Sequence, residues 1–310
     1  MAGTAMSAHF LVGPTAAGKT AVAQRLAEED GFDIVSADSM LVYRGMDIGT
    51  AKPSPKEQAG VKYWCMDLAD PGEHFSVGLY RNAALNALSS IAARGGKAAV
   101  VGGTGLYIKA LTHGLAAAPS ADPAIRAELE RILSAKSVLE LQEILLREAP
   151  GTYEALQDKR NPRRLIRAIE LARAGVRGPL ESWKKNTGPV LTGLRMSLDQ
   201  LRPRIERRVR KMYESGLLEE VNGLLSSGFA TSSTAKGAIG YDEAGAVLDK
   251  RLSLEEAILV TTQRTVQLAR RQATWFRSEP DIAWFEATAS LPLAETLERA
   301  VGYLDAEGRS

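Results

Sequence analysis

The stretch GPTAAGKT at residues 13–20 constrains the fold of this chain more than any other feature. An apolar run, AHFLVG, precedes it, and a helical pattern, TAVAQRLAEE, follows it. Its glycines let the backbone wrap an anion, and the free N–H groups at the start of the helix point at phosphate oxygens. In this spacing Lys19 reaches an outer phosphate, and Thr20 can offer its hydroxyl to Mg²⁺. We therefore expect a phosphate-binding loop between a strand and a helix.

Two further apolar runs, FDIVSAD at residues 32–38 and KAAVVGG at residues 97–103, predict buried strands. Between them, residues 76–94 predict a helix with Ser76 as its N-cap. Apolar strands that alternate with helices are typical of a parallel sheet covered on both faces. The predicted fold class is therefore α/β.

The alternation stops at about residue 120, and residues 120–185 contain no convincing strand. They contain ADPAIRAELERIL, SVLELQEILLREA and NPRRLIRAIELARAG, each with apolar residues at the three- and four-residue spacing of a helix. A returning strand is predicted at 192–199, followed by long helices at 203–226 and 254–276. The pattern indicates a phosphate-binding core interrupted by a helical insertion. Residues 226–237, SSGFATSSTAKG, predict a mobile loop.

Composition excludes several classes of protein. Cys65 is the single cysteine and there are three histidines, so an internal disulfide and a cysteine- or histidine-rich metal site are not expected. No apolar run approaches the roughly 18 residues of a membrane span. The N-terminus MAGTAMSAHF lacks the charged start and long apolar stretch of a signal peptide. We expect a cytoplasmic protein with no membrane partner.

Charge is distributed unevenly along the chain. The formal net charge is +2, yet residues 159–211 carry sixteen Lys and Arg against four Asp and Glu. A basic block in a near-neutral chain favours a polyanionic partner, although a solvated helix face gives the same count.

Asp38 and Thr104 are the candidate chemical groups beyond the loop. Asp38 ends the second predicted strand, and Thr104 follows the third in VGGTGLY. In a parallel sheet the carboxyl ends of the strands face the ligand crevice, so both residues are expected near residues 13–20. A carboxylate there can hold Mg²⁺, accept a proton from a nucleophile, or pair with Lys19. The spacing does not choose among these roles.

A set of motifs in order gives the chain a family resemblance. GPTAAGKT is followed by IVSADSMLVYRGMDIGTAKP, VGGTGLYIKALTHGL, ADPAIR, NPRRLIRAIE and RQATWFR. Together they resemble the bacterial tRNA dimethylallyltransferases, also called tRNA isopentenyltransferases, over residues 8–277. The resemblance implies a P-loop NTPase-like parallel sheet core formed by residues 1–118 and 190–310. It also implies an all-helical domain inserted at residues 119–189 that binds the anticodon stem of tRNA.

The resemblance also implies a reaction. A dimethylallyl group passes from dimethylallyl diphosphate to N6 of the adenosine 3′ of the anticodon, in tRNAs that read codons beginning with U. Asp38 then accepts the proton of the amine. Thr104 and Arg208 act with the loop and Mg²⁺ on the leaving diphosphate. The protein is expected to act as a monomer.

The resemblance assigns these roles to individual residues. The catalytic residues are Asp38, Thr104 and Arg208. The metal ligands are Thr20 and Asp38. The diphosphate is bound by Gly13, Pro14, Thr15, Ala16, Ala17, Gly18, Lys19 and Thr20. The tRNA is bound by Asp38, Ser39, Met40, Leu41, Thr104, Arg126, Arg163, Arg164 and Arg167.

Some positions depart from the family pattern, and three rival functions stay open. Many members have glutamine where this chain has Leu41, and arginines where it has Gly237 and Asp242. We assign no tRNA contact to the last two. The rivals are an adenylate isopentenyltransferase that prenylates a free nucleotide, a small-molecule kinase that uses ATP, and a non-catalytic RNA-binding module.

Overall fold

The computed structural model describes residues 8–116, 118–176, 191–225, 235 and 237–287. The chain forms two compact units: Met1–His113 with Asn186–Ser310, and Gly114–Lys185. Most of the loop predicted at 226–237, and the end of the insertion predicted at 119–189, lie outside the described residues.

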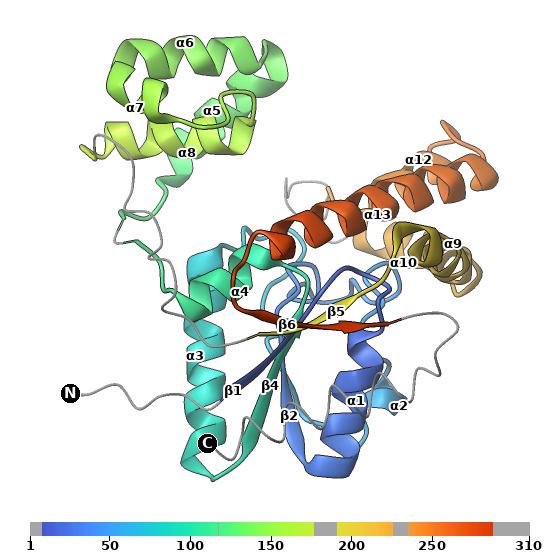
Figure 1. The fold of residues 1–310 in the computed structure, drawn as a ribbon. Coiled ribbons are helices and arrows are strands. Elements are labelled where there is room, and N and C mark those ends of the chain that lie inside the picture. Colours follow the sequence, from blue (N-terminus) through green and yellow to red (C-terminus); the bar gives the residue numbers. More distant parts are fainter. Residues whose placement is uncertain (1–7, 117, 177–190, 226–234, 236, 288–310) are drawn as a thin grey trace. The chain divides into compact units, whose positions relative to one another are not determined.

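The first unit is built on a six-stranded parallel sheet in the order β3-β2-β4-β1-β5-β6 (Figure 1). The strands are β1 (Ala8–Val12), β2 (Phe32–Ser36), β3 (Tyr63–Trp64), β4 (Lys97–Gly102), β5 (Leu191–Arg195) and β6 (Ile282–Glu286). This sheet and its helices confirm the predicted α/β class. The sequence had indicated β1, β2, β4 and β5, but not the edge strands β3 and β6.

The register of the central strands places three loops at one edge of the sheet. Val12 at the end of β1 pairs with Gly102 at the end of β4, and Ser36 at the end of β2 pairs with Val101. The segments that follow these strands therefore begin beside one another. They carry residues 13–20, Asp38 and Thr104, as expected for the ligand edge of a parallel sheet.

Helices of the first unit cover the sheet and extend beyond its ligand edge (Figure 1). Ser76 accepts a hydrogen bond from the Leu79 N–H at 3.2 Å and starts α3 as predicted. Ser197 accepts from the Gln200 N–H at 3.3 Å, so α9 begins where the sequence had suggested a continuing strand. The helices are α1 (Lys19–Asp30), α2 (Pro55–Gln58), α3 (Val77–Ala93), α4 (Gly105–Thr112), α9 (Leu198–Glu214), α10 (Leu217–Leu225), α12 (Tyr241–Leu248) and α13 (Leu254–Arg277).

The regular secondary structure in the described residues of the second unit is all helical, and the unit has a hydrophobic core of its own. Asp122, Ser137 and Asn161 cap its three longer helices through their side chains. Leu129, Leu141, Leu145 and Leu165 are among its fully buried residues. The helices are α5 (Pro123–Ala135), α6 (Val138–Glu148), α7 (Pro150–Ala155) and α8 (Pro162–Arg173), of which α7 was not predicted. None of the helices in the described part of the chain combines the length and apolar character that a membrane crossing needs.

Candidate active site

The loop between β1 and α1 is held in shape by its glycines and by Lys19. Gly13 has a backbone φ of 145° and Gly18 a φ of 104°, values that residues other than glycine rarely adopt. A Cβ on Gly13 would also overlap the Leu194 carbonyl of β5. The Lys19 ammonium donates to the carbonyls of Gly13 at 2.9 Å and Pro14 at 2.8 Å, so it closes the loop on itself.

A pocket of about 500 Å³ opens beside this loop. Its walls come from the start of α1, the carboxyl ends of β2 and β4, one face of α9, and Thr50, Ala51 and Pro53. Arg204, Arg207, Arg208 and Lys211 project into it from α9 at three- and four-residue spacing. The predicted site residues that line it are Thr15, Ala16, Gly18, Lys19, Thr20, Asp38, Leu41 and Arg208.

Asp38 lies in the turn after β2, and its carboxylate orientation is fixed locally. Its Oδ1 accepts the Met40 N–H at 2.9 Å, which engages one carboxylate oxygen with the turn. The next residue, Ser39, donates its N–H to Thr104 Oγ1 at 3.1 Å. The Thr104 N–H donates to the Ala37 carbonyl at 3.2 Å. The structure thus joins the two segments that carry Asp38 and Thr104, although Thr104 itself does not line the pocket.

The pocket is electropositive around Lys19. Burial lowers the pKa of Lys19 to about 8, the charge of Asp38 opposes this shift, and the charge of Arg208 adds to it. Burial also lowers the pKa of Arg208, again opposed by Asp38. Arg208 donates from Nη2 to the Thr50 carbonyl at 3.2 Å. A carbonyl satisfies a donor without cancelling its charge, so the guanidinium still favours an anionic ligand.

Two residues that the sequence analysis did not assign also hold the loop. Arg204 donates from Nε to the Ala16 carbonyl at 2.9 Å. Gln272 of α13 accepts the Thr15 N–H at 2.8 Å. The four-residue spacing from Arg204 to Arg208 was a signal for the first of them. For the second, the signal was its place in the RQATWFR motif.

The pocket residues include oxygen ligands that fit Mg²⁺. Thr20 is exposed in the first turn of α1, and both Thr20 and Asp38 line the pocket. Among the described residues no three His, Cys, Asp or Glu side chains gather into a metal-binding group. Mg²⁺ is usually bound through one or two protein oxygens together with phosphates and water, so this sparse donor set suits it.

Arg126 and Arg167 of the helical unit share one buried carboxylate. Arg126 makes a two-pronged ion pair with Glu170, through Nε at 2.7 Å and Nη2 at 2.9 Å. Arg167 contacts the same carboxylate at 3.3 Å and donates to the Pro119 carbonyl at 2.8 Å. Glu170 is only 3% exposed. The hydrogen bonds to Glu170 raise the pKa of Arg126. These arginines hold α8 against α5 and against the segment before it.

Arg163 and Arg164 differ from that pair. Both side chains are exposed on the first turn of α8, where Asn161 caps their backbone N–H groups. In the described part of the chain neither side chain pairs with a carboxylate. Their charges are accordingly open to solvent and to a polyanion.

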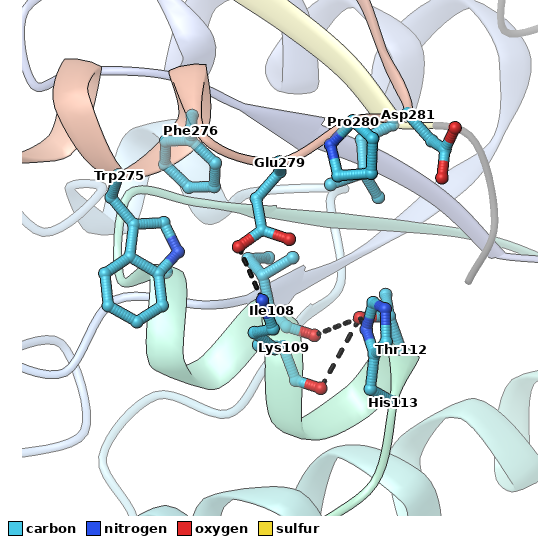
Figure 2. A pocket seen from close by; sticks show the side chains of 11 residues that line it. Ile108, Lys109, Thr112, His113, Trp275, Phe276, Glu279, Pro280 and Asp281 are labelled. Atoms are coloured by element: carbon cyan, nitrogen blue, oxygen red, sulfur yellow. Dashed lines mark hydrogen bonds and ion pairs between the residues drawn. The ribbon is translucent and has the colours of Figure 1, made fainter. Parts of the chain in front are cut away.

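A second pocket lies between α4 and the end of α13 (Figure 2). Lys109 and Glu279 form an ion pair there at 2.7 Å, next to Trp275 and Phe276. Its volume is about 20 Å³, which leaves room for a single water molecule. This pocket is too small for a substrate, so the larger one beside Lys19 is the candidate active site.

A parallel sheet with a GxxxxGK[ST] loop after its first strand defines the P-loop class of phosphate-binding α/β proteins. Comparison with known proteins narrows this class. The family model described as IPP transferase matches residues 41–279, and one described as isopentenyl transferase matches residues 6–68. The chain therefore belongs to the IPP transferase family, which confirms the predicted resemblance.

Individual relatives agree with this assignment. The chain is 40% identical to a tRNA dimethylallyltransferase of Geobacter sulfurreducens, over 96% of this chain and 97% of that protein. The crystal structure of a tRNA isopentenylpyrophosphate transferase from Bacillus halodurans is 35% identical, with a TM-score of 0.70 over 98% of both chains. A eukaryotic dimethylallyltransferase acting on tRNA has a TM-score of 0.74 over 95% of this chain and 77% of that one. At 22% identity it supports the fold alone. The protein is thus a prenyltransferase of the tRNA-modifying class.

Proposed function

We propose that this protein transfers a dimethylallyl group from dimethylallyl diphosphate to N6 of the adenosine 3′ of the anticodon, in tRNAs that read codons beginning with U. One observation carries the proposal. A single pocket joins the phosphate-binding loop with Lys19, the carboxylate of Asp38 and the guanidinium of Arg208. An anionic leaving group needs cations to stabilise its charge, and an amine nucleophile needs a nearby carboxylate to accept its proton.

In the proposed reaction a bond forms between N6 and C1 of the dimethylallyl group while the bond from C1 to the diphosphate oxygen breaks. Asp38 takes the proton that N6 loses. The loop amides, Lys19 and Arg208 stabilise the charge that grows on the diphosphate. Thr20 and Asp38 would hold Mg²⁺, which would add positive charge beside the same phosphates.

The acceptor is proposed to be tRNA, with the helical unit as the part that recognises it. The exposed Arg163 and Arg164 support this, because they can meet phosphates of a tRNA, whereas a free nucleotide would not need exposed arginines on a separate helical unit. The adenosine must leave its stack in the anticodon loop to reach the half-buried carboxylate of Asp38 inside the pocket. Arg126, Arg167, Ser39, Met40 and Thr104 stay predicted tRNA contacts. The monomeric state and the cytoplasmic location also stay predictions.

The test measures transfer of label from dimethylallyl diphosphate to unmodified tRNA or to AMP, each with and without Mg²⁺, with ATP turnover followed in parallel. Label in tRNA alone, dependent on Mg²⁺ and not on ATP, is the expected result. Label in AMP would instead place the protein with enzymes that prenylate free nucleotides. ATP turnover without label would replace the proposal with a kinase.

The variant Asp38→Asn tests the base. Asparagine keeps an oxygen for the Met40 N–H, so the turn is preserved while the proton acceptor is lost. We expect transfer to fall by about 10²- to 10⁴-fold, with tRNA affinity within a few-fold of wild type. Asp70→Asn, at an exposed aspartate paired with Arg44, is the matched control. Wild-type turnover in Asp38→Asn would remove Asp38 from the role of base.

A further inference from the structure

Gln272 reaches from α13 to the phosphate-binding loop, and its amide has one possible orientation. The Thr15 N–H lies 2.8 Å from the oxygen of this side chain. A backbone N–H can only donate, so the oxygen of the amide must face Thr15. The nitrogen, Nε2, therefore points the other way.

The nitrogen end lies between two glycine turns of the site. A Cβ built on Gly103 would have Gln272 Nε2 as its nearest neighbour, and that same Cβ would lie 3.2 Å from the Gly13 carbonyl oxygen. Gln272 also lines the larger pocket together with Lys19 and Arg208. The amide N–H₂ is thus placed where the loop after β1 and the turn after β4 come together.

This nitrogen lacks a hydrogen-bond acceptor among the residues that the structure describes. Gln272 is half-buried, and its nitrogen is not among the fully buried side-chain atoms without a partner, so the nitrogen is accessible to water or to a ligand. The neighbouring cations, Lys19, Arg204 and Arg208, favour an anion in the same pocket. An oxygen of that anion would satisfy the amide.

We propose that Gln272 is a direct ligand of the diphosphate, holding the Thr15 amide through Oε1 and donating from Nε2 to a phosphoryl oxygen. The proposal rests on the proposed function for the identity of the anion. It gives α13 a part in the chemistry, because a donor fixed before the reaction stabilises the charge that develops on a leaving group.

A purely structural brace is the competing explanation, and two variants separate the two roles. Gln272→Glu keeps an oxygen for the Thr15 N–H but turns an oxygen toward the phosphates in place of the donor. Gln272→Met keeps the length of the side chain and loses both hydrogen bonds. A brace is damaged more by methionine, whereas a diphosphate ligand is damaged more by glutamate.

Binding of inorganic diphosphate with Mg²⁺, measured by calorimetry, is the primary readout. We expect Gln272→Glu to weaken it by about ten- to hundredfold, and Gln272→Met by less. Gln267→Glu makes the same charge change at an exposed position of α13, and it should stay within twofold of wild type. Diphosphate affinity within twofold of wild type in Gln272→Glu would overturn the proposal, as would a larger loss in Gln272→Met.

A measurement on the wild-type protein protects the test against misfolded variants. Hydrogen exchange of the Gln272 side-chain amide, followed by NMR, should slow when diphosphate is added. An unchanged exchange rate at saturation would also overturn the proposal. Label transfer to tRNA by wild type is measured separately. Its absence would reject the proposed function, while diphosphate binding would still decide the role of Gln272.

Discussion

The arginines of the pocket and those of the helical unit meet different partners. Arg204 and Arg208 donate to backbone carbonyls of the pocket walls. Arg126 and Arg167 share the buried carboxylate of Glu170. A carbonyl orients an arginine and leaves its charge in place, whereas the carboxylate of Glu170 offsets one of the two charges that it binds. Two arginines therefore keep the pocket positively charged, whereas two arginines of the helical unit mainly stabilise the packing of its helices.

Arg208 offers the largest expected effect in this comparison. Arg208→Ala removes the positive charge that we propose stabilises the leaving diphosphate, and we expect kcat to fall by about 10²- to 10³-fold. Arg208→Lys should recover part of the loss, because an ammonium restores the charge without the fork of donors. Arg210→Ala, at an exposed arginine of the same helix, is the control and should change kcat little. Equal kcat values for Arg208→Ala and Arg210→Ala would erase the contrast between the two regions.

Glu170 offers the corresponding test in the helical unit. Glu170→Gln leaves two arginines with no carboxylate between them, and we expect about 2 kcal/mol of lost local stability. Hydrogen exchange in α5 and α8, which the pair holds together, measures this opening. As a control, Glu140→Gln removes the more exposed ion pair between Lys136 and Glu140 of α6. This change should lower stability by less than about 0.5 kcal/mol. Unchanged hydrogen exchange in Glu170→Gln would mean that the contacts of Arg126 and Arg167 with Glu170 do not stabilise the packing of α5 against α8.

The sequence revealed those parts of the fold that local patterns determine. The strands β1, β2 and β4 and the helix cap at Ser76 are each predicted by a pattern of a few neighbouring residues, and the structure confirms them. The two-residue strand β3 is too short to have a pattern. The boundary of α9 depends on Ser197, which can end a strand or cap a helix. Gly216, with φ 101°, separates α10 from α9 where one helix was predicted.

The site was predictable only in its local part. Residues 13–20, Asp38 and Thr104 follow strands, so the parallel topology brings them to one edge. Gln272 reaches Thr15 across 257 positions of the sequence, and the RQATWFR motif marks Gln272 without indicating that Thr15 is its partner. The pairing of Arg126 with Glu170 spans 44 positions and is equally hidden. A run of basic residues records charge but not which charges are already paired.

The charge of Lys19, and with it the positive charge of the pocket, depends on pH. Burial and Arg208 bring its pKa down to about 8, so the ammonium is charged below that pH and loses its charge above it. We expect kcat/KM for dimethylallyl diphosphate to fall by up to about tenfold per unit above pH 8. Arg208→Gln should move this fall to higher pH, because the neighbouring positive charge is removed. A profile that stays flat to pH 10 would contradict the assignment of Lys19 to the diphosphate.

The smallest expected effect concerns the exposed arginines of α8. Arg163→Ala with Arg164→Ala should weaken tRNA binding by about fivefold at 0.15 M salt, because two solvent-facing charges are lost. The slope of log affinity against log salt should become shallower by about 1.5. Arg173→Ala is the control, because Arg173 contacts Glu148 at 2.9 Å and Glu128 at 3.1 Å. A paired arginine should leave the salt slope unchanged, so equal slopes for the two variants would show that pairing does not decide which arginines meet the RNA.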